Sequence, residues 1–260
     1  DTQLRMDFAL SLFNQNVNSL TWDDPYAGTT GALTYPNSGL VSKPPDNKFW
    51  KLGLQGGTNY SFWDSRLSGA FEYSQMTQDD NLSPYGLGTT PSLLPRPNAN
   101  TEIDVVHILL NASGTPAPGF GLSAKYKYHS TDNQMPATLF NKIPNDNPNL
   151  QLLAPNNAAM AYALPYDYKQ NQATLDGTYK VFTDTIFRLG YAFDAMNRSN
   201  REVRDTYENT GKMVLTQNYS RADASLDASY SSRTEGGTGY NQADLYKLYH
   251  SPQYLAANPY

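Results

Sequence analysis

The sequence predicts an all-β protein, a transmembrane antiparallel meander β-barrel, and three observations lead to this fold class. Short segments alternate regularly between apolar and polar side chains, the chain holds 20 tyrosines, and the mean hydropathy is negative at -0.61. Successive side chains of a strand leave opposite faces of a sheet, so each segment has one apolar and one polar face. A barrel with lipid outside and a hydrophilic interior needs this division.

The clearest segment is "TDTIFRLGYAFDAMNR", residues 183–198. One parity carries the large apolar side chains Phe187, Leu189, Tyr191 and Phe193. The other parity carries the small or charged residues Arg188, Gly190, Ala192 and Asp194. Such a strand fits a surface between two different media.

Alternation of this kind predicts nine strands. They cover residues 4–12, 50–62, 67–73, 106–112, 122–129, 172–182, 187–194, 213–219 and 226–231. The eighth strand has an earlier portion, residues 203–211, that alternates poorly. The whole chain, residues 1–260, is therefore expected to be part of a single outer-membrane β-barrel domain.

The connections between these strands sort by length. Long loops rich in Pro, Asn, Asp and Gly are expected at about residues 13–48, 76–101 and 131–165, with a last one at 234–260. Short turns follow the second, fourth, sixth and eighth strands, and the fourth strand turns through "SGTPAPG", residues 113–119. The short connection "SNRE", residues 199–202, is the one exception on the long-loop side. Outer-membrane barrels place short turns at one rim and long loops at the other.

The strand number predicts a barrel larger than this chain. Nine strands leave the two chain ends on opposite rims, whereas a closed single-chain bacterial barrel has an even number. The final residues, "LYHSPQYLAANPY", have the pattern of a loop. About nine strands of a larger barrel are therefore expected here.

The two parities give two sets of candidate residues. Those expected to face the lumen or a partner in it are Arg5, Asp7, Lys51, Arg66, Glu72, His107, Lys125, Lys127, Asp176, Lys180, Arg188 and Asp194. Those expected to face lipid are Leu52, Leu54, Phe71, Ile108, Leu110, Leu175, Phe187, Leu189, Tyr191 and Phe193. Tyrosines expected near strand ends, at the level of lipid headgroups, are Tyr60, Tyr73, Tyr126, Tyr128, Tyr179, Tyr191, Tyr219 and Tyr230.

Composition excludes several classes of protein. The chain has no run of about 18 apolar residues, so membrane-spanning helices are excluded. A net charge of -5 argues against nucleic-acid binding. Without cysteine the chain has no disulfide, zinc-thiolate site or covalent haem attachment. The start, "DTQLRMDFAL", lacks the features of a signal peptide.

A catalytic or metal site has little support in the sequence. His107, His129 and His250 are scattered and show no metal-binding spacing. His107 is best interpreted as a polar residue of the lumen. The acidic loop segments "QDDNLSPYG", "STDNQ" and "IPNDNPN" could supply oxygen ligands for calcium. A soluble β-sandwich, propeller or lectin is the alternative fold, although its core would favour Val, Ile and Leu over Tyr.

Charged residues also gather at the rim where the long loops are expected. The cluster consists of Arg198, Arg201, Glu202, Arg204 and Glu208. It is a candidate docking surface for an external partner, and a solvated rim is the simpler interpretation.

The stretch from residue 166 to 233 resembles the MtrB/PioB family of decahaem-associated outer-membrane β-barrels. The likeness lies in "LGYAFDAMNR", "NREVRDTYENT" and the closing "YSSR", and "NSLTWDDPYAG" near the start resembles a loop of the family. Family members are much longer. The cysteine pair that some carry near the N-terminus has no counterpart here.

The resemblance implies an integral protein of the bacterial outer membrane that sheathes a periplasmic multihaem c-type cytochrome in its lumen. The haem would be carried by that partner, with none bound by this chain, and electrons would cross the outer membrane. A second, extracellular multihaem cytochrome would dock at the long-loop rim. The alternative function is a general diffusion porin or solute transporter.

Overall fold

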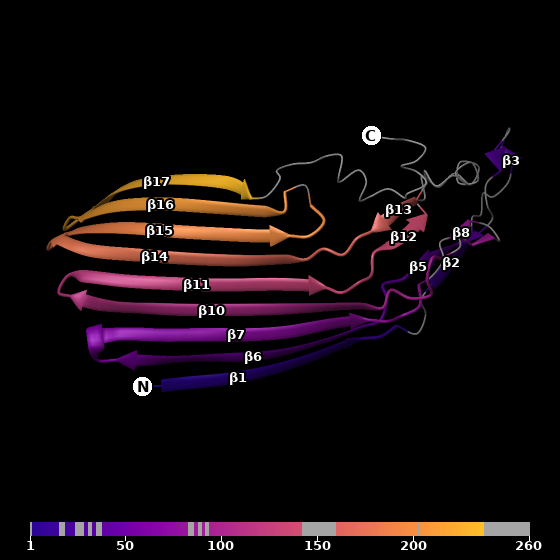
Figure 1. Ribbon diagram of the computed structural model, residues 1–260, viewed down its shortest axis with the longest axis horizontal. Helices are drawn as coiled ribbons and strands as arrows, with labels where there is room; N and C mark the ends of the chain where they lie inside the picture. Colours follow the sequence, from indigo (N-terminus) through magenta and orange to yellow (C-terminus); the bar gives the residue numbers. More distant parts are fainter. Residues whose placement is uncertain are drawn as a thin grey trace.

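The computed structural model describes residues 2–15, 19–23, 29–30, 33–34, 38–82, 86–87, 90–91, 94–141, 160–201 and 203–236. Nine long strands form one sheet in the order β1-β6-β7-β10-β11-β14-β15-β16-β17 (Figure 1). They are β1 (Thr2–Phe13), β6 (Asn47–Tyr60), β7 (Ser65–Gln78), β10 (Thr101–Ala117), β11 (Phe120–Asn133), β14 (Tyr168–Phe182), β15 (Thr185–Arg198), β16 (Asp205–Asn218) and β17 (Asp223–Gly236). Every neighbouring pair is antiparallel. The predicted meander is confirmed, and within the described residues the sheet is open, with β1 and β17 at its edges.

The two ends of the sheet differ as predicted. Figure 1 shows the turns β6/β7, β10/β11, β14/β15 and β16/β17 together at one end, and the long connections at the other. We call these the turn end and the loop end. The chain enters β1 at the turn end and leaves β17 at the loop end.

One predicted turn is shorter in the structure. Residues 113–119 were expected to turn, but β10 continues to Ala117 and the turn contains Pro118 and Gly119. The register shifts between Gly114 and Ala117, and such a bulge accommodates Pro116, which has no backbone N–H for a regular ladder. Gly119 takes a positive φ of 74°, a conformation that glycine adopts without steric cost.

The turn between β6 and β7 also differs from the prediction. The predicted strand ran to Phe62, but β6 ends at Tyr60 and the 3-10 turn η1 (Phe62–Asp64) follows. Trp63 and Asp64 take positive φ values of 57° and 45°. A strand cannot continue through two such residues, because strand backbone requires negative φ.

The long connections contain short strands that alternation did not reveal. A small sheet has the order β2-β5-β8-β9, and two further pairs are β3-β4 and β12-β13. Their bounds are β2 (Ser19–Asp23), β3 (Thr29–Thr30), β4 (Leu33–Thr34), β5 (Ser38–Ser42), β8 (Gly86–Leu87), β9 (Thr90–Pro91), β12 (Thr138–Asn141) and β13 (Met160–Ala163). Most are too short for a period of two to be recognised. In the predicted final loop β17 reaches Gly236, and residues 237–260 lie outside the described part.

The eighth long strand includes its poorly alternating earlier portion. β16 starts at Asp205 and runs to Asn218. In the earlier portion Gly211 lies opposite Tyr191 and Asn209 lies opposite Phe193, so small or polar residues stand where the pattern expected apolar ones. The Tyr191 hydroxyl donates to Asn209 Oδ1 at 2.5 Å. Pairing with the neighbouring strand therefore stabilises a strand segment whose own apolar/polar alternation is weak.

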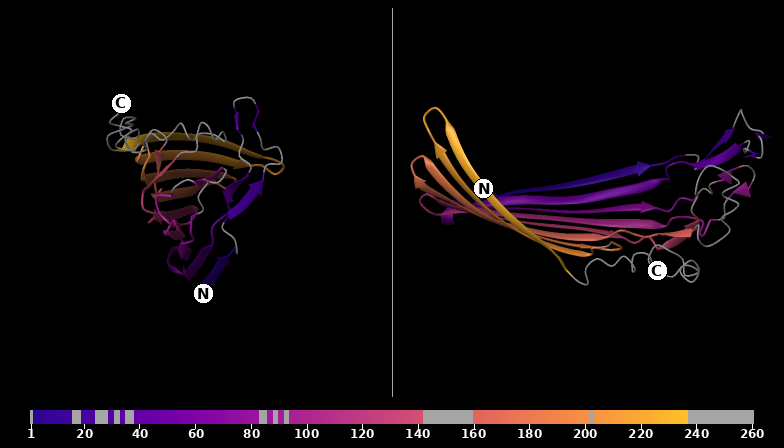
Figure 2. Two further views of the ribbon diagram at one scale, coloured as in Figure 1. Left: turned by 90° about the vertical axis from the view of Figure 1, so that its right-hand side faces the viewer. Right: turned by 90° about the horizontal axis from the view of Figure 1, so that it is seen from above.

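The sheet is a single curved layer, as the end-on view in Figure 2 shows. Among the described residues, none of the hydrophobic side chains is buried, and Leu4, Leu226 and Tyr230 are 82%, 71% and 77% exposed. A β-sandwich would instead bury such side chains between two packed sheets. Within the described part of the chain, no helix has the length and apolarity needed to cross a membrane.

Candidate luminal surface

The strand register defines two faces of the sheet. Starting at Arg5 and following directly paired residues from β1 to β17, one row consists of Arg5, Gln55, Ala70, Leu109, Lys127, Gln172, Asp194, Glu208 and Arg233. Directly paired residues share a face. We call the face of this row the polar face and the opposite one the apolar face.

All predicted site residues fall on these faces as two separate sets. The register places Arg5, Asp7, Lys51, Arg66, Glu72, His107, Lys125, Lys127, Asp176, Lys180, Arg188 and Asp194 on the polar face. It places Leu52, Leu54, Phe71, Ile108, Leu110, Leu175, Phe187, Leu189, Tyr191 and Phe193 on the apolar face. That the first set faces a lumen and the second faces lipid stays a prediction.

The apolar face becomes polar near the loop end. Trp50 and Tyr73 make an edge-to-face contact with ring centroids 5.1 Å apart. Trp50 Nε1 donates to Gln75 Oε1 at 3.0 Å, and the Tyr73 hydroxyl donates to Asp104 Oδ1 at 2.6 Å. Indole and phenol groups of this kind suit the boundary between hydrocarbon and water.

The tyrosines do not all lie at strand ends, and this part of the prediction is wrong. Tyr126, Tyr191 and Tyr230 stand within β11, β15 and β17. A mid-strand tyrosine can satisfy its hydroxyl across the ladder: Tyr126 donates to Asn171 Oδ1 on β14 at 2.7 Å. Alternation in the sequence predicted the face on which each tyrosine lies, but not the hydrogen-bond partner of its hydroxyl.

Ion pairs cross neighbouring strands on the polar face. Lys51 Nζ lies 2.8 Å from Glu72 Oε2, and Lys212 Nζ lies 3.6 Å from Asp227 Oδ1. Asp194 accepts a hydrogen bond from the side-chain amide of Gln172 at 2.7 Å. These contacts organise the polar face from within the chain.

Glu208 belongs to this network, which corrects its assignment to a rim cluster. It lies inside β16, where its carboxylate contacts Arg233 Nη2 at 2.5 Å and accepts from the Ser231 hydroxyl at 2.7 Å. Weak alternation in this part of β16 hid its position. Arg233 and Lys212 are further polar-face charges that the alternating pattern did not reveal.

The other described members of that predicted cluster lie at the connection between β15 and β16, where the Arg198 backbone N–H donates to the Arg204 carbonyl at 2.8 Å. Arg198 ends β15 and donates through Nη2 to Thr206 Oγ1 at 3.1 Å. The Arg201 guanidinium lies over the Tyr166 ring, 4.6 Å from its centroid. Glu202 lies outside the described residues. Docking of an external partner at this rim stays a prediction.

Two carboxylates of the polar face lie over glycines of the next strand. A Cβ atom added to Gly53 would fall 2.6 Å from Asp7 Oδ2, and one added to Gly190 would fall 2.6 Å from Asp176 Oδ1. Only glycine leaves this space free. The carboxylate of Asp7 is thus directed toward β6.

His107 and His129, which are scattered in sequence, are directly opposite each other on β10 and β11. Their Nδ1 atoms are 2.8 Å apart, and the Tyr168 ring stacks on His129 with centroids 4.6 Å apart. Within the described residues, no group of three or more His, Cys, Asp or Glu side chains could hold a metal ion. Of the candidate calcium loops, residues 143–149 lie outside the described part, so calcium binding stays a prediction.

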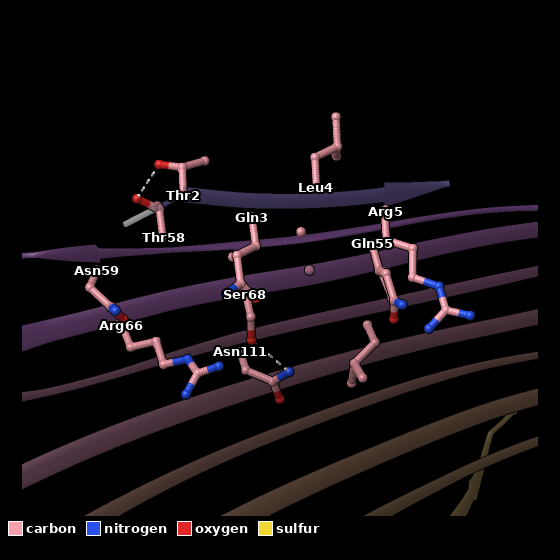
Figure 3. A pocket seen from close by; sticks show the side chains of 15 residues that line it. Thr2, Gln3, Leu4, Arg5, Gln55, Thr58, Asn59, Arg66, Ser68 and Asn111 are labelled. Atoms are coloured by element: carbon pink, nitrogen blue, oxygen red, sulfur yellow. Dashed lines mark hydrogen bonds between the residues drawn. The ribbon is translucent and has the colours of Figure 1, made fainter. Parts of the chain in front are cut away.

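The polar face is hollowed toward the turn end (Figure 3). The hollow has a volume of about 1000 Å³, and Arg5 and Arg66 contribute its charges. Its polar lining also includes Gln3, Gln55, Asn59 and Asn111. Figure 3 shows Leu4 pointing away from the side on which Arg5 and Arg66 lie. We call this feature the basic hollow.

These features together define a class of protein. A single-layer antiparallel meander, loops sorted by length between its two ends, an exposed apolar face and a charged opposite face are the features of a transmembrane outer-membrane β-barrel. Irregular edges and unpaired strands are not stable in hydrocarbon, so such a sheet spans a membrane as part of a closed barrel.

The chain belongs to the MtrB/PioB family. The family model described as "Putative outer membrane beta-barrel porin, MtrB/PioB" matches residues 1–256, which confirms the resemblance seen in the sequence. The protein is accordingly an integral protein of the outer membrane.

A solved structure, OmpTdeltaL8 (loop L8 deletion mutant of OmpT), an outer membrane protein of Vibrio cholerae, has a TM-score of 0.41 and 12% identity, covering 90% of this chain and 71% of that chain. A search of curated proteins found no match.

Proposed function

We propose that this protein is the barrel sheath of a transmembrane electron conduit, holding and insulating a multihaem c-type cytochrome in the outer membrane. The observation that carries the proposal is the polar face, which bears charged side chains from β1 to β17. A hydrophilic protein can pair with such a surface. Family membership supports the same assignment.

The chain itself would not conduct electrons. It contains no cysteine and therefore no covalent c-type haem attachment. The haems would be carried by the partner, and the sheet would separate them from lipid. We likewise propose no enzymatic role, because no spacing of residues typical of a catalytic site was recognised in the sequence.

The division of the two faces explains how a sheath could work. Charged and hydrogen-bonding groups cannot be exposed to hydrocarbon without a free-energy cost. A partner whose surface is polar needs a wall that is polar inside and apolar outside. The face of Leu54, Ile108 and Leu189 would contact lipid, and the face of Lys51, Glu72 and Asp194 would contact the cytochrome.

The test is purification of the full-length protein from outer membranes in mild detergent, followed by haem staining. A c-type cytochrome is expected to copurify, and its haem-stained band is expected to disappear from the outer membrane when this protein is deleted. Recovery of the intact barrel without any haem protein, under conditions that preserve membrane complexes, would contradict the sheath function.

A diffusion porin or solute transporter is the second candidate, and the word "porin" in the family description favours it. An open pore lined by the polar face would conduct ions in a planar bilayer without a partner, and deletion would reduce uptake of small solutes. A sheath filled by a cytochrome would conduct poorly until that partner is removed. An extracellular cytochrome at the long-loop rim and calcium in the loops remain secondary proposals.

A further inference from the structure

The basic hollow carries positive charge that the described part of the chain does not neutralise. None of the residues that line it is an aspartate or glutamate. Neither Arg5 nor Arg66 has a hydrogen-bond or ion-pair partner among the described residues, and both are exposed. Two free guanidinium groups on one concave surface are suited to binding anions.

Asp7 does not neutralise Arg5, although both stand on the polar face of β1. Its carboxylate lies over Gly53, so close that a Cβ there would be 2.6 Å from Asp7 Oδ2. Gly53 is not among the residues that line the hollow. The nearest carboxylate along the strand is therefore directed to another part of the surface.

The positive surface continues beyond the hollow along β11. Lys125 and Lys127 are on the same face and are exposed. Lys127 lies in the same paired row as Arg5, and Lys125 lies in the row of Gln3. On the polar face of β1 through β11, cations thus outnumber carboxylates, which are Asp7 and Glu72.

The spacing of the two arginines indicates what kind of anion fits. The row of Arg5 meets β7 at Ala70, four residues from Arg66. Strand geometry then separates the two Cα atoms by about 16 Å. Figure 3 shows the guanidinium groups apart at opposite ends of the hollow, with amide side chains between them. A segment bearing two or more carboxylates can contact both arginines, whereas one small anion cannot.

From this geometry we infer that the basic hollow docks an acidic segment of the protein held in the lumen. This inference rests on the proposed sheath function and specifies the chemistry of the partner surface. Guanidinium groups pair with carboxylates through two parallel N–H···O bonds. Gln3, Gln55 and Asn59 can hydrogen-bond the backbone or side chains between those carboxylates. In barrels whose short turns face the periplasm, the site lies toward the periplasmic mouth, where a periplasmic partner enters.

The test uses the full-length complex, purified through this chain and washed with increasing NaCl, with retained haem as the readout. In the variant Arg5→Gln/Arg66→Gln, binding of the haem protein is expected to weaken about tenfold at physiological salt. Gln keeps hydrogen-bonding groups, so the loss reports on charge. The amount of each variant in the outer membrane is measured by immunoblot as the control for folding.

Arg221→Gln is the control. Arg221 lies in the turn between β16 and β17, outside the predicted partner-facing set. It is exposed and has no ion pair among the described residues, and it lies outside the hollow. It is expected to retain haem like the unmodified protein, and Arg5→Lys/Arg66→Lys is expected to keep most of the binding because the charge remains.

The outcomes separate this inference from the function on which it rests. If the unmodified protein retains the haem protein and Arg5→Gln/Arg66→Gln releases it no more easily than Arg221→Gln, the docking site is wrong and the sheath function stands. If the unmodified protein retains no haem protein, both are wrong.

Discussion

The two faces of this sheet share one backbone and differ in how their side chains are stabilised. On the polar face, side chains contact one another across strands, as in the pairs Lys51–Glu72 and Glu208–Arg233. On the apolar face, Leu4 is 82% and Leu189 58% exposed, and no hydrophobic core lies within the described residues. The polar face is organised within the chain, whereas the apolar face depends on its surroundings.

This difference indicates where each face is sensitive to change. The free energy of placing an apolar side chain on the outer face comes from the medium, so substitution there should be governed by the cost of exposing charge to hydrocarbon. Substitution on the polar face should be governed by local crowding and by single hydrogen bonds. Variants at matched positions on the two faces test this distinction.

The largest effect is expected from arginine on the apolar face. Leu189 pairs with Gly177 and Met213, and Ala192 pairs with Thr174 and Thr210 on the polar face. Leu189→Arg should lower the free energy of unfolding by about 2–4 kcal/mol, while Ala192→Arg should change it by less than about 1 kcal/mol. Urea titration of the protein folded in lipid vesicles measures both. Equal costs at the two positions would show that the faces are assigned wrongly.

A smaller effect is expected where a carboxylate covers a glycine on the polar face. Gly190→Ala places a methyl group 2.6 Å from Asp176 Oδ1, so the carboxylate must rotate and unfolding free energy should fall by about 1 kcal/mol. Gly211 on the apolar face has no heavy atom within 4 Å of such a methyl group. Gly211→Ala should therefore raise stability by about 0.5 kcal/mol, because alanine loses less backbone entropy.

A double-mutant cycle isolates the contact at Gly190. In an Asp176→Ala background, Gly190→Ala should no longer destabilise, since the group that it displaces is absent. If Gly190→Ala still lowers the unfolding free energy in this background, the loss arises from the backbone and not from the contact with Asp176.

Alternation predicted the strands and the face of each site residue, because a period of two fixes the face whatever the pairing. It could not predict which residues meet across strands. His107 and His129, or Glu208 and Arg233, become partners only through the register, and turn geometry sets the register. The turn at Pro118 and Gly119 illustrates this limit, because the bulge before it was not visible in the pattern.

The basic hollow could not be predicted from the sequence, for a related reason. Arg5 and Arg66 were both predicted to face the lumen, but they are far apart in the chain, and alternation does not say that β1, β6 and β7 bring them to one surface. A long connection separates β1 from β6 in the sequence, so the sequence does not show that these strands are neighbours. The short strands β2 and β5 within that connection were missed because a few residues do not establish a period.

The smallest effect is expected near the loop end of the apolar face. There this face also carries hydrogen-bonded polar side chains, so the difference between the two faces is small. The Tyr73 hydroxyl donates to Asp104, while Asp104 also accepts from Gln75 at 3.1 Å and Gln134 at 2.9 Å. Tyr73→Phe removes one of three donors and keeps the ring against Trp50, so the unfolding free energy should fall by only about 0.5–1 kcal/mol.

Tyr230→Phe is the control for that variant. Tyr230 is 77% exposed on the apolar face, and within the described residues its hydroxyl has no hydrogen-bond partner. The unfolding free energy of the Tyr230→Phe variant in the urea titration should be unchanged, because no intramolecular hydrogen bond is lost. If Tyr73→Phe is equally neutral, the phenol of Tyr73 is hydrogen-bonded by water as well as by Asp104. The apolar band would then end closer to the turn end than Tyr73, near Phe71. The loop end of the sheet would accordingly extend further out of the membrane.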